Sequence, residues 1–150
     1  MIAVVADDIT GAAEVAGAGL GFGLDAEVHT TFEPSSAASL IVIDTASRSL
    51  SPSGAAARAG QAARAVRDAG AEWVYKKVDS VLRGPVLAEL AAVLDAVGCA
   101  RAILAPANPS RGRVIRRGRY LIEGRGLAET GFASDPEHPA GSSRVLDLLG

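Results

Sequence analysis

Short apolar segments alternate with alanine-rich segments along most of this chain, and this alternation restricts the fold more than any other feature. The apolar segments have the length of strands, which we expect at residues 2–6, 26–30, 40–43, 73–78 and 101–105. The alanine-rich segments have helical spacing and predict helices at residues 10–20, 51–70 and 84–98. Strands that alternate with helices form a mainly parallel sheet with helices on both faces. The sequence therefore predicts an α/β fold with three layers, similar to a Rossmann fold.

Two of the predicted helices carry an apolar stripe at helical spacing. The helix at 51–70 begins favourably, because Ser51 can cap it and Pro52 fits its first turn. Its stripe is formed by Ala55, Ala59, Ala62, Val66 and Ala69. In the helix at 84–98, the predicted stripe is formed by Leu87, Leu90, Leu94 and Val97.

The pattern changes in the last third of the chain. Residues 119–123 and the segment around Leu127 predict a β-hairpin excursion near 113–130, and residues 143–149 begin a helix. Little sequence follows to cover the apolar side chains of this last segment, Leu146, Leu148 and Leu149. We therefore expect residues 1–150 to be an incomplete domain of a larger protein.

Composition argues against several classes of partner. The chain has 150 residues, 49% hydrophobic and 21% charged, with a net charge of −2, which is ordinary for one globular domain and does not indicate nucleic acid. The single cysteine, Cys99, excludes an intrachain disulfide and a cysteine-based zinc site. The apolar start is too short for a signal peptide, and no run reaches the roughly 20 apolar residues of a membrane span. We expect a cytoplasmic protein with no nucleic-acid or membrane partner.

Two acidic residues, Asp7 and Asp8, follow the first predicted strand and precede a helix. A carboxylate at this position can accept hydrogen bonds from ligand hydroxyls or hold a cation. Acidic residues also stabilise the N-terminus of a helix, so capping is the plainer interpretation. Because one cap needs only one acid, we favour a binding role for the pair.

Arg48 lies in the polar segment 44–49 (DTASRS), after the third predicted strand. Its guanidinium could bind a carboxylate through two parallel hydrogen bonds. A polar loop ahead of the Ser51 cap explains the same segment equally well.

The segment 76–84 (KKVDSVLRG) places two lysines, a carboxylate, a hydroxyl and an arginine at a strand–helix junction. In α/β proteins such junctions lie at the carboxyl edge of the sheet, where ligands bind. Strand alternation sends Lys76 and Lys77 to opposite faces, and a lysine in a buried strand needs an anion or a polar cleft. An internal Lys–Asp pair and a capping serine are the plainer interpretation. We favour binding of a small anionic, hydroxylated ligand by Lys77, Asp79, Ser80 and Arg83.

Other features of the sequence carry weaker signals. Six arginines between residues 111 and 125 could touch phosphate or an acidic partner, but we favour a solvated face. His29 and His138 are far apart and have no neighbouring ligand pattern, so no metal site is predicted. The glycines at 17–23 lack the spacing of a nucleotide-binding loop, and no Walker sequence is present.

Taken together, these segments resemble the four-carbon acid sugar kinase family, which includes threonate, erythronate and 3-oxo-tetronate kinases. The matching stretches follow the family's order from the first residue almost to the last: residues 6–12 (ADDITGA), 44–48 (DTASR), 76–84, 105–113 and 129–136 (ETGFASDP). Several weak motifs in one order are more specific than any one of them alone.

The resemblance implies a two-domain enzyme whose N-terminal domain holds the sugar acid and whose C-terminal domain binds ATP with Mg²⁺. This chain looks like most of the first domain and none of the second, so we expect the chain alone to bind no cofactor and to be inactive. A homodimer is one candidate assembly.

The resemblance also implies roles for single residues. The arginines would meet the carboxylate of the sugar acid, and the aspartates and the serine would meet its hydroxyls. Asp8 and Asp79 are the candidates for the base that takes a proton from the acceptor hydroxyl. The pocket would be lined by Asp8 or Asp7, Arg48, Asp79, Ser80 and Arg83.

Two positions depart from the family pattern. Ala46 stands where the family usually has Asp, which removes one hydroxyl acceptor, and Asn108 replaces an apolar, often aromatic residue. These departures allow a substrate different from that of the usual members, or a loss of activity.

Two other functions fit the same residues. A receiver-like phosphoacceptor domain also carries paired acids after its first strand and another acid after its third, here Asp7, Asp8 and Asp44, but it leaves the segment 76–84 unexplained. A non-catalytic sugar-acid-binding protein would share the pocket and lack only an ATP partner.

Overall fold

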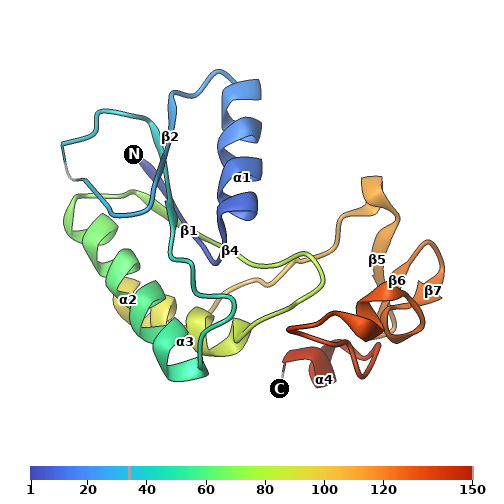
Figure 1. Cartoon of the computed structure of the whole chain (residues 1–150). Coiled ribbons are helices and arrows are strands. Elements are labelled where there is room, and N and C mark those ends of the chain that lie inside the picture. The colour runs from blue at the N-terminus through green and yellow to red at the C-terminus, as the bar shows by residue number, and fades with distance from the viewer. Residues whose placement is uncertain (34, 150) are drawn as a thin grey trace.

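A computed structural model describes residues 1–33 and 35–149, in which two units of different architecture follow one another along the chain (Figure 1). The first unit contains a four-stranded parallel sheet with the strand order β2-β3-β1-β4. Its strands are β1 (Ile2–Ala6), β2 (Ala26–His29), β3 (Leu40–Asp44) and β4 (Trp73–Lys77). The predicted parallel sheet is thus confirmed, and β1 lies in its middle.

Helices cover both faces of this sheet, as the sequence predicts. One helix lies on one face and two lie on the other (Figure 1): α1 (Ile9–Gly21) is opposite α2 (Pro52–Asp68) and α3 (Val86–Val97). Alternate strand residues point to opposite faces, so Val4 packs under α1 whereas Val5 packs under α2 and α3. None of the helices in the described part of the chain is long and apolar enough to cross a membrane.

The buried face of α3 differs from the predicted stripe. Leu87, which we expected to be buried, is 43% exposed. The buried residues of this helix are Val86, Glu89, Val93 and Ala96. Because the segment is apolar on almost every side, hydrophobicity alone does not determine how the helix is rotated about its axis. Glu89 lies on the buried face, where its carboxylate pairs with the buried ammonium of Lys76 in β4.

The second unit contains a three-stranded antiparallel sheet and confirms the predicted hairpin excursion. Its strands are β5 (Arg113–Arg116), β6 (Arg119–Ile122) and β7 (Arg125–Gly126), followed by short 3₁₀ helices and α4 (Val145–Leu149). Tyr120 and Leu127 are fully buried and pack with Val81 and Ala140. Because Val81 belongs to the turn after β4, this small core attaches the second unit to the first.

The fifth predicted strand, at residues 101–105, is wrong. These residues have no regular secondary structure, and Ile103 is 97% exposed. A strand requires a neighbouring strand for its hydrogen bonds, and this segment instead runs from the end of α3 to the second unit (Figure 1). Its Leu104 packs against Val78 and Leu82. The apolar run at 101–105 therefore packs against the fold through one side chain and is not a strand of the sheet.

Candidate functional site

The carboxyl end of β1 presents two neighbouring carboxylates that have different surroundings. Asp8 caps α1, because its Oδ1 accepts a hydrogen bond from Gly11 N at 2.8 Å, and its side chain lines a cavity. A Cβ on Gly11 would lie 2.9 Å from that oxygen, so glycine leaves room for the cap. Asp7 is buried, and its Oδ2 accepts a hydrogen bond from Arg48 Nε at 2.7 Å.

Arg48 connects the loop after β3 to the acidic end of β1. The backbone carbonyl of Asp7 accepts hydrogen bonds from Ser47 N at 2.9 Å and from Arg48 N at 3.3 Å. The Arg48 guanidinium also lies 2.8 Å from Asp8 Oδ1 and 3.6 Å from Asp79 Oδ1. Burial opposes its charged form, but the neighbouring carboxylates, Asp7 foremost, raise the pKa of Arg48 above its ordinary value. Protein carboxylates therefore already compensate the charge of Arg48.

The turn after β4 brings a third carboxylate and a second arginine to the same place. Asp79 Oδ2 accepts hydrogen bonds from the backbone N–H groups of Val81 and Arg83, each at 3.1 Å. The Arg83 guanidinium donates to both oxygens of Asp79, at 2.9 and 3.1 Å, and lies 3.0 Å from Asp135 of the second unit. Burial opposes ionisation of Asp79, but the hydrogen bonds and the charge of Arg83 hold the pKa of Asp79 below its ordinary value.

Lys76 and Lys77 lie on opposite faces of β4, as strand alternation predicts. Lys77 lines the cavity, and its Nζ lies 3.2 Å from Glu14 Oε2. Lys76 is buried on the other face, where its Nζ lies 3.0 Å from Glu89 Oε2. The internal partner of the buried lysine is thus Glu89 of α3, which the sequence does not single out, and not the nearby Asp79.

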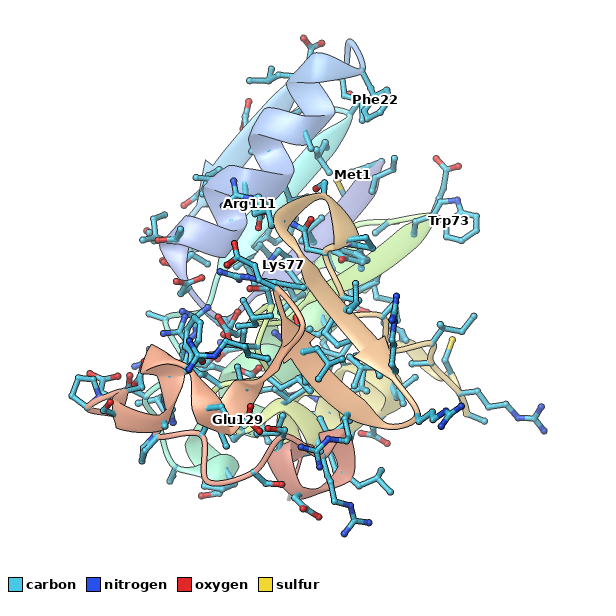
Figure 2. All side chains as sticks on the ribbon, turned by 90° about the vertical axis from the view of Figure 1, so that its right-hand side faces the viewer. Met1, Phe22, Trp73, Lys77, Arg111 and Glu129 are labelled. Atoms are coloured by element: carbon cyan, nitrogen blue, oxygen red, sulfur yellow. The ribbon has the colours of Figure 1, made fainter. Side chains whose placement is uncertain are left out.

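One cavity of about 330 Å³ collects most of the predicted site residues. This volume lies at the lower end of the range of about 300–1,000 Å³ for small-molecule sites. Figure 2 labels two of its residues, Lys77 of β4 and Arg111 of the turn before β5. Asp7 does not line the cavity. The predicted residues that do line it are Asp8, Arg48, Lys77, Asp79, Ser80 and Arg83. Their shared location is observed, and their functional roles stay predictions.

Two arginines correct the expectation that the stretch at 111–125 is only a solvated face. Arg111 and the half-buried Arg113 both line the cavity, and Arg113 Nη1 donates a hydrogen bond to Ser80 Oγ. Gly112 turns the chain between them with a φ of +65°. The other four arginines are exposed, as expected, and do not line this cavity: Arg116, Arg117, Arg119 and Arg125.

The remaining wall residues include one of the two departures from the family pattern. Asn108 lies in the wall, as does Glu14, which the sequence did not single out. Ala46 is exposed, does not line the cavity and has a φ of +45°.

The third acidic residue of the receiver-like alternative lies elsewhere. Asp44 accepts a hydrogen bond from Ala46 N at 2.9 Å and lines a different cavity, together with Arg58. The strand order β2-β3-β1-β4 also differs from the 2-1-3-4-5 order of flavodoxin-like receivers. Within residues 1–33 and 35–149, no group of three or more His, Cys, Asp or Glu side chains is placed to hold a metal ion.

Known proteins resemble this chain over almost its whole length. A family profile described as "Sugar-binding N-terminal domain" matches residues 2–150. The chain is 38% identical to a D-threonate kinase of Salmonella typhimurium, over 97% of this chain and 35% of that protein. It is 29% identical to a 3-oxo-tetronate kinase of Pseudomonas fluorescens, over 99% of this chain and 37% of that protein.

A solved structure shares the fold. A crystal structure of a Bordetella bronchiseptica protein, described as a domain-swapped dimer with bound citrate, matches with a TM-score of 0.89 at 34% identity. The match covers 99% of this chain and 39% of that one. The chain thus spans little more than a third of the length of each of these relatives.

Proposed function

Because the chain belongs to the sugar-binding N-terminal domain family of the four-carbon acid sugar kinases, we propose that its cavity binds a four-carbon sugar acid of the threonate or erythronate type. In a complete enzyme, this acid would accept a phosphoryl group from ATP. The observation that carries the proposal is the convergence of three separate loops, through Asp8, Arg48 and Arg83, on one small cavity. Arginines and carboxylates together suit a ligand that carries both a carboxylate and hydroxyls.

Of the two candidate bases, Asp8 fits the acceptance of the hydroxyl proton better than Asp79. Both oxygens of Asp79 already accept hydrogen bonds, and its lowered pKa makes it a weak proton acceptor. Asp8 uses Oδ1 for Gly11 N and Arg48, and its Oδ2 has no hydrogen-bond partner among the described residues. A free carboxylate oxygen in the cavity wall can take the proton when the hydroxyl attacks.

ATP and Mg²⁺ would be held by the part of such a kinase that this chain does not span. Bound there, they would supply the phosphoryl group and neutralise its charge. Among the described residues no group of three or more His, Cys, Asp or Glu side chains is placed to hold a metal ion, and the sequence contains no Walker loop. The work of this chain is therefore to hold the acid and align its hydroxyl. We expect no turnover by the 150-residue chain with ATP alone.

Isothermal titration calorimetry with D-threonate, D-erythronate and 3-oxo-tetronate tests the proposal. At least one of these acids should bind at millimolar concentration or below. Asp8→Asn should weaken binding about tenfold, because it removes the charge that accepts ligand hydroxyls. Asp68→Asn, at the exposed end of α2, is the matched control and should change nothing. Absence of heat with all three acids at millimolar concentration would contradict the proposal.

Simple assays distinguish the proposed function from the two alternative functions. A non-catalytic sugar-acid-binding protein shares every feature of the cavity, so only turnover in a complete enzyme distinguishes it. The receiver-like alternative loses support because Asp44 lies outside the cavity. Acetyl phosphate with Mg²⁺ should leave every aspartate unmodified, and a phosphorylated aspartate would restore that alternative.

The Bordetella relative also bears on ligand class and assembly. Its crystal structure is described with bound citrate, which is itself a hydroxylated carboxylate, and as a domain-swapped dimer. A homodimer of this chain is proposed on that likeness, and light scattering of the purified chain tests it.

A further inference from the structure

The charges around the cavity are distributed unevenly. Protein carboxylates compensate three of its cations: Arg48 pairs with Asp7 and Asp8, Arg83 with Asp79 and Asp135, and Lys77 with Glu14. Three of these five carboxylates, Asp8, Glu14 and Asp79, line the cavity together with the three cations. Arg111 and Arg113 form no ion pair with any residue that the structure describes, although both line the cavity. The lining therefore balances three carboxylates against three paired cations on the side of Asp8 and has an excess of positive charge on the side of β5.

The Arg113 guanidinium is held in place without being neutralised. Its Nη1 donates a hydrogen bond to Ser80 Oγ, and its central carbon lies 5.8 Å from the ring centre of Phe132. Arg83 lies 5.7 Å from the same ring centre, so Phe132 supports both arginines. A half-buried cation without a counter-ion is unfavourable, and an incoming anion relieves this cost. A guanidinium fixed in advance also loses little entropy when it binds a planar carboxylate.

We propose that Arg113, assisted by Arg111, binds the carboxylate of the sugar acid, and that the hydroxyl-bearing carbons extend from there toward Asp8. This inference rests on the proposed function. It replaces the assignment implied by the family resemblance, in which Arg48 and Arg83 meet the carboxylate.

Arg48 and Arg83 have a different role in this arrangement. Each is already paired with two or more protein carboxylates, so a further anion gains less from them. They hold Asp8 and Asp79 in position, and Arg113 determines the preference for acids over neutral polyols. The second unit therefore supplies the group that recognises the charge of the ligand.

Calorimetry with two matched ligands tests this assignment. D-threitol has the same four carbons as D-threonate but a neutral CH₂OH group in place of the carboxylate. Arg113→Gln should lower the affinity for threonate about 10- to 150-fold, the range for hydrogen bonds to charged groups, and leave the affinity for threitol within about twofold. Arg116→Gln, on the same strand but exposed, is the control and should change neither affinity. Arg113→Lys keeps the charge and should lose less than Arg113→Gln.

A second measurement uses only the wild-type chain and therefore does not depend on whether a variant folds. In the wild-type chain, the NMR signal of the Arg113 Nε–H group should shift when threonate is added and stay unchanged with threitol. A shift confined to Arg48 and Arg83 would overturn the inference, as would unchanged threonate affinity in Arg113→Gln. If the wild-type chain binds no sugar acid, the proposed function fails as well. If threonate binds equally to the wild type and Arg113→Gln, only the carboxylate assignment fails.

Discussion

Lys76 of β4 and Glu89 of α3 form a buried ion pair on the face of β4 opposite the cavity. Lys76 Nζ and Glu89 Oε2 are 3.0 Å apart, and their side chains are only 3% and 2% exposed. Ser47 Oγ donates a hydrogen bond to the other oxygen of Glu89. The pair therefore links β4 and α3 to the loop that carries Arg48.

Glu89→Gln should destabilise the fold by about 3–5 kcal/mol, the cost of removing one partner from a buried pair. The substitution conserves the shape of the side chain but leaves the Lys76 ammonium buried without a counter-ion. Domains of this kind have about 5–15 kcal/mol of stability, so the loss is a large fraction of the total. Lys76→Met combined with Glu89→Leu removes both charges and should cost much less than the two single substitutions added together.

Urea denaturation followed by circular dichroism measures these costs as shifts of the midpoint at unchanged slope. The control is Asp68→Asn, because Asp68 forms an exposed pair with Arg67, with side chains 65% and 47% exposed. Its cost should stay below about 1 kcal/mol. A similarly small cost for Glu89→Gln, or additive costs in the double variant, would show that the Lys76–Glu89 pair does not stabilise the fold.

Three further predictions concern the loops around the cavity. Gly84→Ala should lower the free energy of unfolding by more than about 1 kcal/mol in the same urea assay and weaken sugar-acid binding. The reason is that Gly84 has a φ of +82° and that a Cβ there would lie 2.9 Å from Arg48 O. Wild-type stability and affinity in this variant would contradict the prediction. Ala46→Gly should raise the free energy of unfolding by about 1 kcal/mol, since Ala46 has a φ of +45°; a lower midpoint would show that this backbone strain is absent. Asp79→Asn should lower the free energy of unfolding by an amount that is fully present above the ordinary Asp pKa of 3.8. This loss should shrink as pH falls through the lower pKa of the folded state, because the fold stabilises only ionised Asp79. A loss that grows toward low pH would contradict the lowered pKa of Asp79.

The centre of the first sheet could be predicted because β1 and β3 are apolar runs that end in polar loops. Leu40–Asp44 is buried throughout, as expected for a parallel strand covered on both faces. The run at 101–105 has a similar composition but does not pair, since an apolar segment can also be used through one packing residue, here Leu104. Composition does not distinguish a run that pairs in a sheet from one that packs through a single side chain, because the path of the whole chain decides between them.

The cavity could be predicted in part for a related reason. Asp8, Arg48 and Asp79 follow strand ends, and parallel strand ends meet at one edge of the sheet. Glu89 escaped notice because its inward direction depends on the rotation of α3. Arg113 belongs to the basic stretch for which the sequence favours a solvated face, because it reaches the cavity only when the second unit folds back onto the turn after β4.

A crystal structure of the chain with D-threonate would locate the bound acid. We expect electron density for the acid in the cavity between the three loops, with its carboxylate on Arg113 and a hydroxyl within hydrogen-bond distance of Asp8. Density in another cavity, such as the one lined by Asp44 and Arg58, with this one empty, would show that the three loops do not form the binding site.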